Sequence, residues 1–392
     1  MKQLENFFRT LSLTFLGVFV ITAVPAAAQQ EPDPMDNIEI GLITCSPHDE
    51  VYSLYGHSAI HYRDKASQLD IVFSYGVFNY NKPFFIGRFM FGLTDYELGV
   101  YSFPLFCKEY ERWGAQVAEQ VLNLTPNEKR RITEALFENA KPNNRTYRYN
   151  FFYDNCSTRP RDIIERHLDG KIEYKELTTE REKTYRQLLH EKTANHCWTA
   201  FGSDLLLGFK ADMKADIRQQ QFLPENLQLD FMTANIVHDG QQRPLVKEYI
   251  VWRPLGQQAE NNDNPLRPIY VFTLLLIVSI AIFIYEEKRK TCLRWFDATL
   301  MTITGLAGVI LFVMIFSQHP ATSTNLQILI LNPLALGALP NVIRGRSTRW
   351  FRLSFVCIIA FFAGWFLQDY AEGMEILALC LLLRYWRHRH EK

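Results

Sequence analysis

The sequence predicts an exported α+β domain followed by a helical transmembrane bundle of about five spans. Three observations support this: a secretory-type N-terminus, further apolar runs crowded into the last third, and strand-like and helix-like patterns between them. The length of 392 residues, at roughly 150 residues per domain, also favours two or three units.

Charge and composition exclude several classes of protein. Lys+Arg and Asp+Glu both number 42, so the formal net charge is zero, but the last third is basic and the region before it is acidic. A large acidic domain argues against nucleic-acid binding. A hydrophobic content of 48% excludes a disordered chain, and the crowded apolar runs exclude a wholly soluble one.

The N-terminus has the layout of a signal peptide over residues 1–28. Lys2 and Arg9 precede an apolar stretch, which is followed by small residues up to Ala28 and then by polar Gln29. This order is typical of a secretory signal with an A-x-A cleavage site, so we expect cleavage after Ala28. The alternative is an uncleaved anchor helix. No Cys follows the apolar stretch, so the chain is not expected to be a lipoprotein itself.

The C-terminal third predicts a transmembrane domain at 269–386, between a polar linker (257–268) and a tail (387–392). Lys and Arg gather after the first, third and fifth apolar segments and are missing from the two other loops, around 318–325 and 369–373. The positive-inside rule then predicts a multi-pass protein of the bacterial inner (cytoplasmic) membrane, with a periplasmic N-terminal domain and a cytoplasmic C-terminus. The fifth segment contains Glu375 and is short, so a re-entrant or interfacial helix is the alternative. The segments are 269–285, 298–317, 326–343, 350–368 and 374–386.

The exported region, 29–256, is long enough for one well-buried α+β domain. Thr125-Pro126-Asn127-Glu128 is a capping box that predicts a helix up to about Lys141. A second helix is expected from about Cys156 to Asp169, and a third opens at Thr179. Alternating apolar, aromatic and β-branched residues predict strands at 38–45, 52–62, 71–78, 96–103, 146–152 and 248–253.

Cys156 is the candidate nucleophile. It follows a short strand and stands in the first turn of a predicted helix, where N–H groups and the helix dipole lower the pKa of a thiol. Arg159 and Arg161 would act in the same direction. A small buried Cys that happens to begin a helix is the structural alternative, so a base is needed to decide.

His57 is the candidate base, because small neighbours flank it on a predicted strand. His61, four residues later, lies on the same strand face, where a structural role is favoured. A His on an early strand that precedes a Cys on a later helix reverses the usual papain order. It is the order of permuted papain-like (NlpC-like) thiol enzymes, which is the fold expected for the exported domain.

Four blocks occur in order in the exported part: 44–47 (TCSP), 55–59 (YGHSA), 74–79 (SYGVFN) and 149–159 (YNFFYDNCSTR). The membrane part adds 318–322 (QHPAT), Asn325 and 332–334 (NPL). Together they resemble the signature blocks of the Lnb-type lipoprotein N-acyltransferase family, over nearly the whole mature chain. The resemblance implies transfer of a fatty acyl chain from a phospholipid to the α-amine of a diacylglyceryl-cysteine lipoprotein.

The residue pattern supplies a mechanism for such a transfer, with a Cys156 thioester and His57 as acid and base. N–H groups at the helix start are the expected oxyanion hole. Cys45 is a rival nucleophile, and the oxidising compartment would permit a disulfide among Cys45, Cys107 and Cys197. Tyr75, Asn79 and His61 are candidates to orient His57, and Asn155, Arg159, His319, Asn325 and Asn332 are candidates to bind substrate.

No metal spacing, phosphate loop or dinucleotide fingerprint is present, and no cofactor is expected. A cell-wall peptidase or amidase is the alternative enzyme, since one fold supports acyl transfer and amide hydrolysis. A phospholipase or acyl-migration enzyme with the same dyad is another. A non-catalytic membrane scaffold that binds lipoproteins is the alternative from a different class.

Overall fold

The computed structural model describes residues 33–48, 50, 53–78, 83–84, 87–88, 91–176, 178, 181–257, 266–319, 321–346 and 349–388. The predicted signal peptide, Asn79, the expected helix start at Thr179 and linker residues 258–265 lie outside these ranges. The chain divides into two compact units, Met1–Asp36 and Asn37–Lys392. The 3₁₀ turn η1 (Pro34–Asn37) is described at the end of the first, and all other described elements belong to the second.

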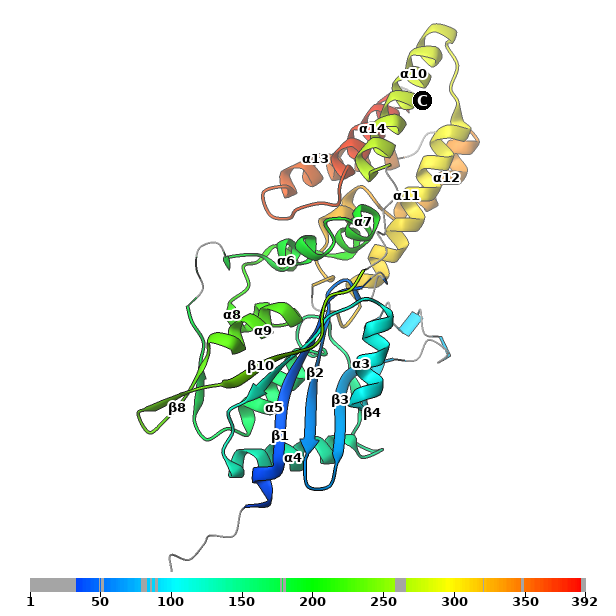
Figure 1. Ribbon diagram of the computed structural model, residues 1–392. Coiled ribbons are helices and arrows are strands. Elements are labelled where there is room, and N and C mark those ends of the chain that lie inside the picture. Colours follow the sequence, from blue (N-terminus) through cyan, green and yellow to red (C-terminus); the bar gives the residue numbers. More distant parts are fainter. Residues whose placement is uncertain are drawn as a thin grey trace, which may run out of the picture. The chain divides into compact units, whose positions relative to one another are not determined.

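A seven-stranded antiparallel sheet organises the exported part of the described chain, in the order β10-β5-β1-β2-β3-β4-β6 (Figure 1). Central β1 is buried along almost its whole length, which explains its nearly continuous apolar sequence. The strands are β1 (Ile38–Cys45), β2 (His57–Asp64), β3 (Leu69–Val77), β4 (Asp95–Ser102), β5 (Val117–Leu122), β6 (Thr146–Arg148) and β10 (Val246–Arg253).

Helices cover both faces of this sheet. On β3, Val72 packs in the cluster beneath α3 (Phe103–Arg112), while its neighbour Phe73 meets Phe137 of α4 (Pro126–Ala140) on the other face. Helices α5 (Thr158–Arg166) and α9 (Pro224–Thr233) contact the sheet at β2 and β1. The remaining exported elements are α6 (Tyr185–Lys192), α7 (Cys197–Leu206), η4 (Phe209–Asp212), α8 (Ile217–Gln220) and a small sheet of β7 (Lys171–Glu173), β8 (Asn235–His238) and β9 (Gln241–Pro244).

Local signals explain where several elements begin. The predicted capping box at Thr125 and Glu128 is present at the start of α4. A second capping box, at Thr184 and Gln187, opens α6. Gly56, with φ of +75°, makes the turn before β2, and a Cβ there would lie 2.8 Å from the Cys45 carbonyl oxygen. Strand β2 therefore begins at His57, five residues later than the pattern predicted.

Within the described residues of the C-terminal part, helices occur in each of the five predicted segments. Pro268–Arg289, Arg294–Ile315 and Leu326–Ile343 are long and apolar enough to cross a membrane, whereas Trp350–Gly364 is shorter. The third is interrupted, because a 3₁₀ turn is followed by Asn332, whose side chain accepts from the Leu334 N–H. The elements are α10 (Pro268–Arg289), α11 (Arg294–Ile315), η5 (Leu326–Leu329), α12 (Leu334–Ile343), α13 (Trp350–Gly364) and α14 (Met374–Arg387).

Helix α7 joins the exported part to the apolar core of the C-terminal helices. Phe201, Leu205 and Leu206 pack against that core. Just beyond α7, the Gly208 and Phe209 N–H groups donate to carbonyl oxygens of the loop between α11 and η5, at 2.7 and 2.9 Å. The loop around 318–325, which contains no Lys or Arg, therefore lies against the segment that follows α7.

The architecture is thus a mixed α/β sheet domain followed by a helical region. The relation to permuted papain-like enzymes stays a prediction, because it rests on the chain order of His57 and Cys156.

Candidate active site

The segments that carry Cys156 and His57 meet at one end of the sheet. His57 is the first residue of β2, and Cys156 lies in the turn before α5. The Ser58 and Ser157 hydroxyl oxygens are 2.9 Å apart. The residue after His57 is therefore hydrogen-bonded to the residue after Cys156.

Asn155 fixes the turn that presents Cys156. Its Nδ2 donates to the Phe151 and Phe222 carbonyls at 2.9 and 2.8 Å, and its Oδ1 accepts the Ser157 and Thr158 N–H groups, both at 2.9 Å. Two donated and two accepted bonds use the whole capacity of an amide. Asn155 is also buried, so its contacts are those of a positioning residue.

The start of α5 does not activate the thiol in the way the sequence suggested. The helix begins at Thr158, two residues after Cys156, and the Ser157 and Thr158 N–H groups are taken up by Asn155. Burial raises the pKa of the Cys156 thiol, and hydrogen bonds from the Ser58 and Cys156 N–H groups and the Ser157 hydroxyl offset only part of this rise. Cys156 is therefore a neutral thiol at neutral pH in the free protein.

His57 is held by a residue that the sequence patterns did not single out. Its Nε2 lies 2.9 Å from the Ser74 Oγ, on the neighbouring strand β3. Burial lowers the pKa of His57 to about 4, so the imidazole is neutral at neutral pH. The β2–β3 hairpin register, which pairs Ile60 with Phe73, was the signal available, because it places Ser74 diagonally across from His57.

The other residues predicted to orient His57 have different surroundings. His61 is buried between two carboxylates, with Nδ1 2.8 Å from Glu119 and Nε2 2.6 Å from Asp70. Hydrogen bonds and charges of these carboxylates outweigh burial and raise the pKa of His61. Tyr75 is buried beside Arg159, and its hydroxyl has no partner within the described part of the chain.

Cys45 is close to the site but enclosed. It pairs with His57 in the β1–β2 register, and its side chain is 1% exposed in the cluster beneath α3. Burial raises the pKa of the Cys45 thiol, against a hydrogen bond with Tyr110. Cys156 is half-buried, so it is the more accessible of these two thiols. Cys45, Cys107 and Cys156 are free thiols.

Arg159 lies next to the thiol turn and is paired. Its Nε and Nη2 donate to the two carboxylate oxygens of Asp154 at 2.6 and 2.8 Å. Its guanidinium carbon also lies 3.5 Å from the centroid of the Tyr147 ring, which is a cation–π contact. Arg159 thus brings positive charge to the α5 side of the site while remaining fixed.

The three predicted substrate-binding residues of the membrane part lie at the junction with the exported domain or beyond it. The Asn325 amide donates to the Leu205 carbonyl and accepts from Gln368, and Asn332 caps α12. His319 is half-buried in the loop beside Gly92. Its backbone nitrogen would lie 3.0 Å from a Cβ added to Gly92. The structure therefore groups His319 and Asn325 at the junction and leaves Asn332 at a helix start.

The same junction reaches the segment that precedes Cys156. Ala321 of the membrane loop packs in one apolar cluster with Phe152, and Phe151 at the edge of this cluster contacts Tyr55 with ring centroids 5.0 Å apart. Tyr55 comes two residues before His57. Both candidate catalytic segments therefore rest on side chains that pack against the membrane loop.

Two family models match the chain. Residues 26–191 match the Lnb N-terminal periplasmic domain, and residues 259–391 match the Lnb transmembrane domain. Neither a curated protein nor a solved structure matches.

The two matches occur in the order of the sheet domain and the helical region. They indicate a membrane protein with a periplasmic domain, an enzyme, and a role in lipoprotein biogenesis. The chain thus has a matching periplasmic domain, which presents a Cys and a His on adjoining segments, followed by a matching transmembrane domain. It therefore belongs to the Lnb family.

Proposed function

We propose that this protein is a lipoprotein N-acyltransferase of the bacterial inner membrane, with its C-terminus in the cytoplasm. It moves a fatty acyl chain from a phospholipid, through a Cys156 thioester, to the α-amine of a diacylglyceryl-cysteine lipoprotein. The observation that carries the proposal is the 2.9 Å hydrogen bond between the Ser58 and Ser157 hydroxyls, which joins the residues that follow His57 and Cys156. The attachment of this site to a membrane loop at Ala321 supports lipid substrates.

The first half-reaction forms the thioester. With the Nε2 proton directed at Ser74, the Nδ1 of His57 carries the lone pair that removes the thiol proton. The sulfur attacks the ester carbonyl of the phospholipid, and the C–O bond to the glycerol breaks. His57 returns its proton to the departing alkoxide, so a lysophospholipid leaves and the acyl group stays on Cys156.

The oxyanion of the tetrahedral intermediate needs donors close to the sulfur. The N–H groups of Ser58 and Cys156 lower the pKa of the Cys156 thiol against the effect of its burial, whereas those of Ser157 and Thr158 are bound to Asn155. We assign the oxyanion hole to Ser58 and Cys156, in place of the helix start expected from the sequence. These are backbone groups, so they are held in position before the substrate arrives.

The second half-reaction transfers the acyl group. The α-amine of the lipoprotein attacks the thioester carbonyl while His57 removes a proton from the nitrogen. The C–S bond then breaks, the proton passes to the sulfur, and the amide product leaves with the Cys156 thiol restored. Arg159 and His319 are proposed contacts for the lipid headgroups, whereas Asn155, Asn325 and Asn332 are proposed to position the backbone around the site.

The test is acylation of the purified full-length protein by a phospholipid with a labelled acyl chain, without acceptor, followed by intact-mass analysis. We expect an acyl adduct that is lost in Cys156→Ala and kept in the matched control Cys45→Ala. A synthetic diacylated lipopeptide should then discharge the adduct and gain the label. An adduct on Cys45 would reverse the nucleophile assignment, and free fatty acid as the main product would indicate a phospholipase.

A further inference from the structure

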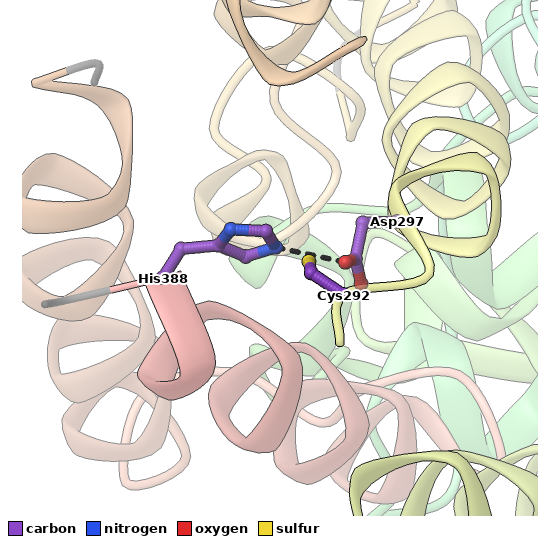
Figure 2. A group of neighbouring side chains, drawn as sticks. All are labelled: Cys292, Asp297 and His388. Carbon is purple, nitrogen blue, oxygen red and sulfur yellow. Dashed lines mark hydrogen bonds and ion pairs between the residues drawn. The ribbon is translucent and has the colours of Figure 1, made fainter. Parts of the chain in front are cut away.

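A second group of reactive side chains lies in the membrane part, away from the candidate active site. Figure 2 shows Cys292, Asp297 and His388 directed toward one another. They come from the loop after α10, the first turn of α11 and the residue that follows α14. One ligand atom from each, a sulfur, a carboxylate oxygen and a ring nitrogen, lies within 4.8 Å of the other two.

The surroundings hold these groups in place. Asp297 and His388 are buried, and Cys292 is half-buried. The His388 ring stacks on Phe351 at 4.5 Å, and its Nε2 lies 2.8 Å from the Asp297 Oδ2. His388 is therefore part of the packed helical core, although the sequence placed it in a basic tail.

The charges around the group leave one negative charge to be neutralised. Arg384 donates to both oxygens of Asp297 and to both oxygens of Glu286, and these three residues are buried. Two carboxylates and one guanidinium sum to one negative charge. This excess matters because an uncompensated buried charge is costly.

We propose that Cys292, Asp297 and His388 form a binding site for a divalent transition metal of the zinc type. Cys292 gives up its thiol proton to solvent on binding, so the metal dication and the thiolate together add one positive charge. The total charge of the cluster is then zero, and the bound metal leaves no uncompensated buried charge. Sulfur, nitrogen and oxygen donors are the set that zinc takes.

The geometry requires a small adjustment. The metal takes the lone pair of Asp297 Oδ2 that the His388 Nε2–H now occupies, while Arg384 keeps its two bonds to the carboxylate. Two metal–ligand bonds of about 2.0–2.1 Å in tetrahedral geometry separate N and O by about 3.3 Å. The present separation of 2.8 Å must therefore widen by about half an ångström. Three protein ligands leave the fourth position for water.

A metal in this site would fasten the loop after α10 and the start of α11 to the end of α14. His388 lies 91 residues after Asp297, so no short spacing motif contains all three ligands. The site is independent of acyl transfer at Cys156 and goes beyond the proposed function.

The test uses purified full-length protein in detergent, first stripped with a chelator and then titrated with Co²⁺. Thiolate-bound cobalt gives a charge-transfer band in the near ultraviolet and d–d bands in the visible. We expect these bands to saturate at one equivalent and to disappear on addition of one equivalent of Zn²⁺. We expect Cys292→Ser to lose the charge-transfer band and His388→Gln to weaken cobalt binding.

Two controls separate this site from other thiols. Cys357→Ser removes a thiol of α13 outside the cluster and should leave the spectrum unchanged. Cys156→Ala should also leave it unchanged, because it removes the thiol of the candidate active site. A charge-transfer band that persists in Cys292→Ser, that vanishes in Cys156→Ala, or that never forms in the unsubstituted protein would overturn the proposal.

Discussion

The hydrogen bond between Ser74 and His57 makes the sharpest prediction about catalysis. In Ser74→Ala the His57 Nε2 loses its partner at 2.9 Å, while the imidazole stays in place and remains neutral. A hydrogen bond of this kind contributes about 0.5–1.5 kcal/mol net. Since about 1.36 kcal/mol corresponds to a tenfold change in rate, the thioester step should slow by about 2- to 13-fold.

The slowing expected for Ser74→Ala should be compared with the effect of removing the base itself. General-base catalysis contributes about 10²–10⁴-fold, so His57→Ala should be slower than Ser74→Ala by at least an order of magnitude. Ser74→Thr keeps a hydroxyl on the same strand and should recover most of the rate. Ser102→Ala, which removes an exposed hydroxyl that makes no cap hydrogen bond at the start of α3, should have no effect.

The assay is a single-turnover measurement, in which enzyme in excess over labelled phospholipid is quenched at intervals and the acyl adduct is quantified by intact mass. The rate at saturating lipid should fall, while the lipid concentration for half-maximal rate stays constant, because Ser74 is not a contact to the donor. An unchanged rate in Ser74→Ala would refute the orienting role. A loss as large as that of His57→Ala would mean that Ser74 does more than orient the ring.

Three further predictions concern stability and thiol reactivity. Asn155→Ala leaves four backbone groups without their partner, at a cost of about 1 kcal/mol or more each. The Tm should therefore fall by roughly 8–16 °C, whereas the control Asn139→Ala should change it little. A fall under about 2 °C would contradict the role of Asn155 in fixing the turn. Because the pKa of His61 is raised, its stabilising contribution is complete below about pH 6.5 and is lost as the pH rises through the folded value. Thermal unfolding should therefore show a fall in Tm on the alkaline side that His61→Gln lacks. Alkylation of Cys156 by iodoacetamide can be followed by mass spectrometry in a Cys45→Ala background. Because burial raises the pKa of the Cys156 thiol, the alkylation rate should be low at pH 7 and should still increase with pH at pH 9. A rate that reaches its plateau near neutral pH would show that a thiolate is present.

Strands whose side chains follow one simple rule could be predicted from the sequence. β1 was expected at its observed bounds because apolar residues recur along it at Ile38, Ile40 and Leu42. β5 was not expected, because Glu119 and Gln120 interrupt its pattern although both are buried. Glu119 is tolerated there because His61 and Trp252 bind its two oxygens. These partners come from other strands, so the information that makes β5 a strand is not local.

The same contrast between local and tertiary information applies to the candidate site. Cys156 and His57 were chosen as candidates from their immediate neighbours and their order in the chain. Ser74 depends on the register of β2 against β3, which a single-strand pattern does not contain. Asn155 was expected to contact substrate, but its side chain fixes a turn. One of the bonds that shows this goes to the Phe222 carbonyl, far along the chain. The candidate residues could thus be proposed from the local sequence, whereas the contacts that surround them are set by tertiary structure.

The burial of Cys156 has a consequence for the survival of the protein outside the cytoplasm. Oxidation to sulfenic acid and formation of mixed disulfides both begin with the thiolate. A nucleophile kept protonated by burial presents little thiolate to the oxidants of the periplasm. If, as proposed, His57 removes this proton only when an acyl donor is bound, the resting protein would stay reduced without a dedicated reductant, and its working lifetime would depend on how little of the thiol is ionised between turnovers.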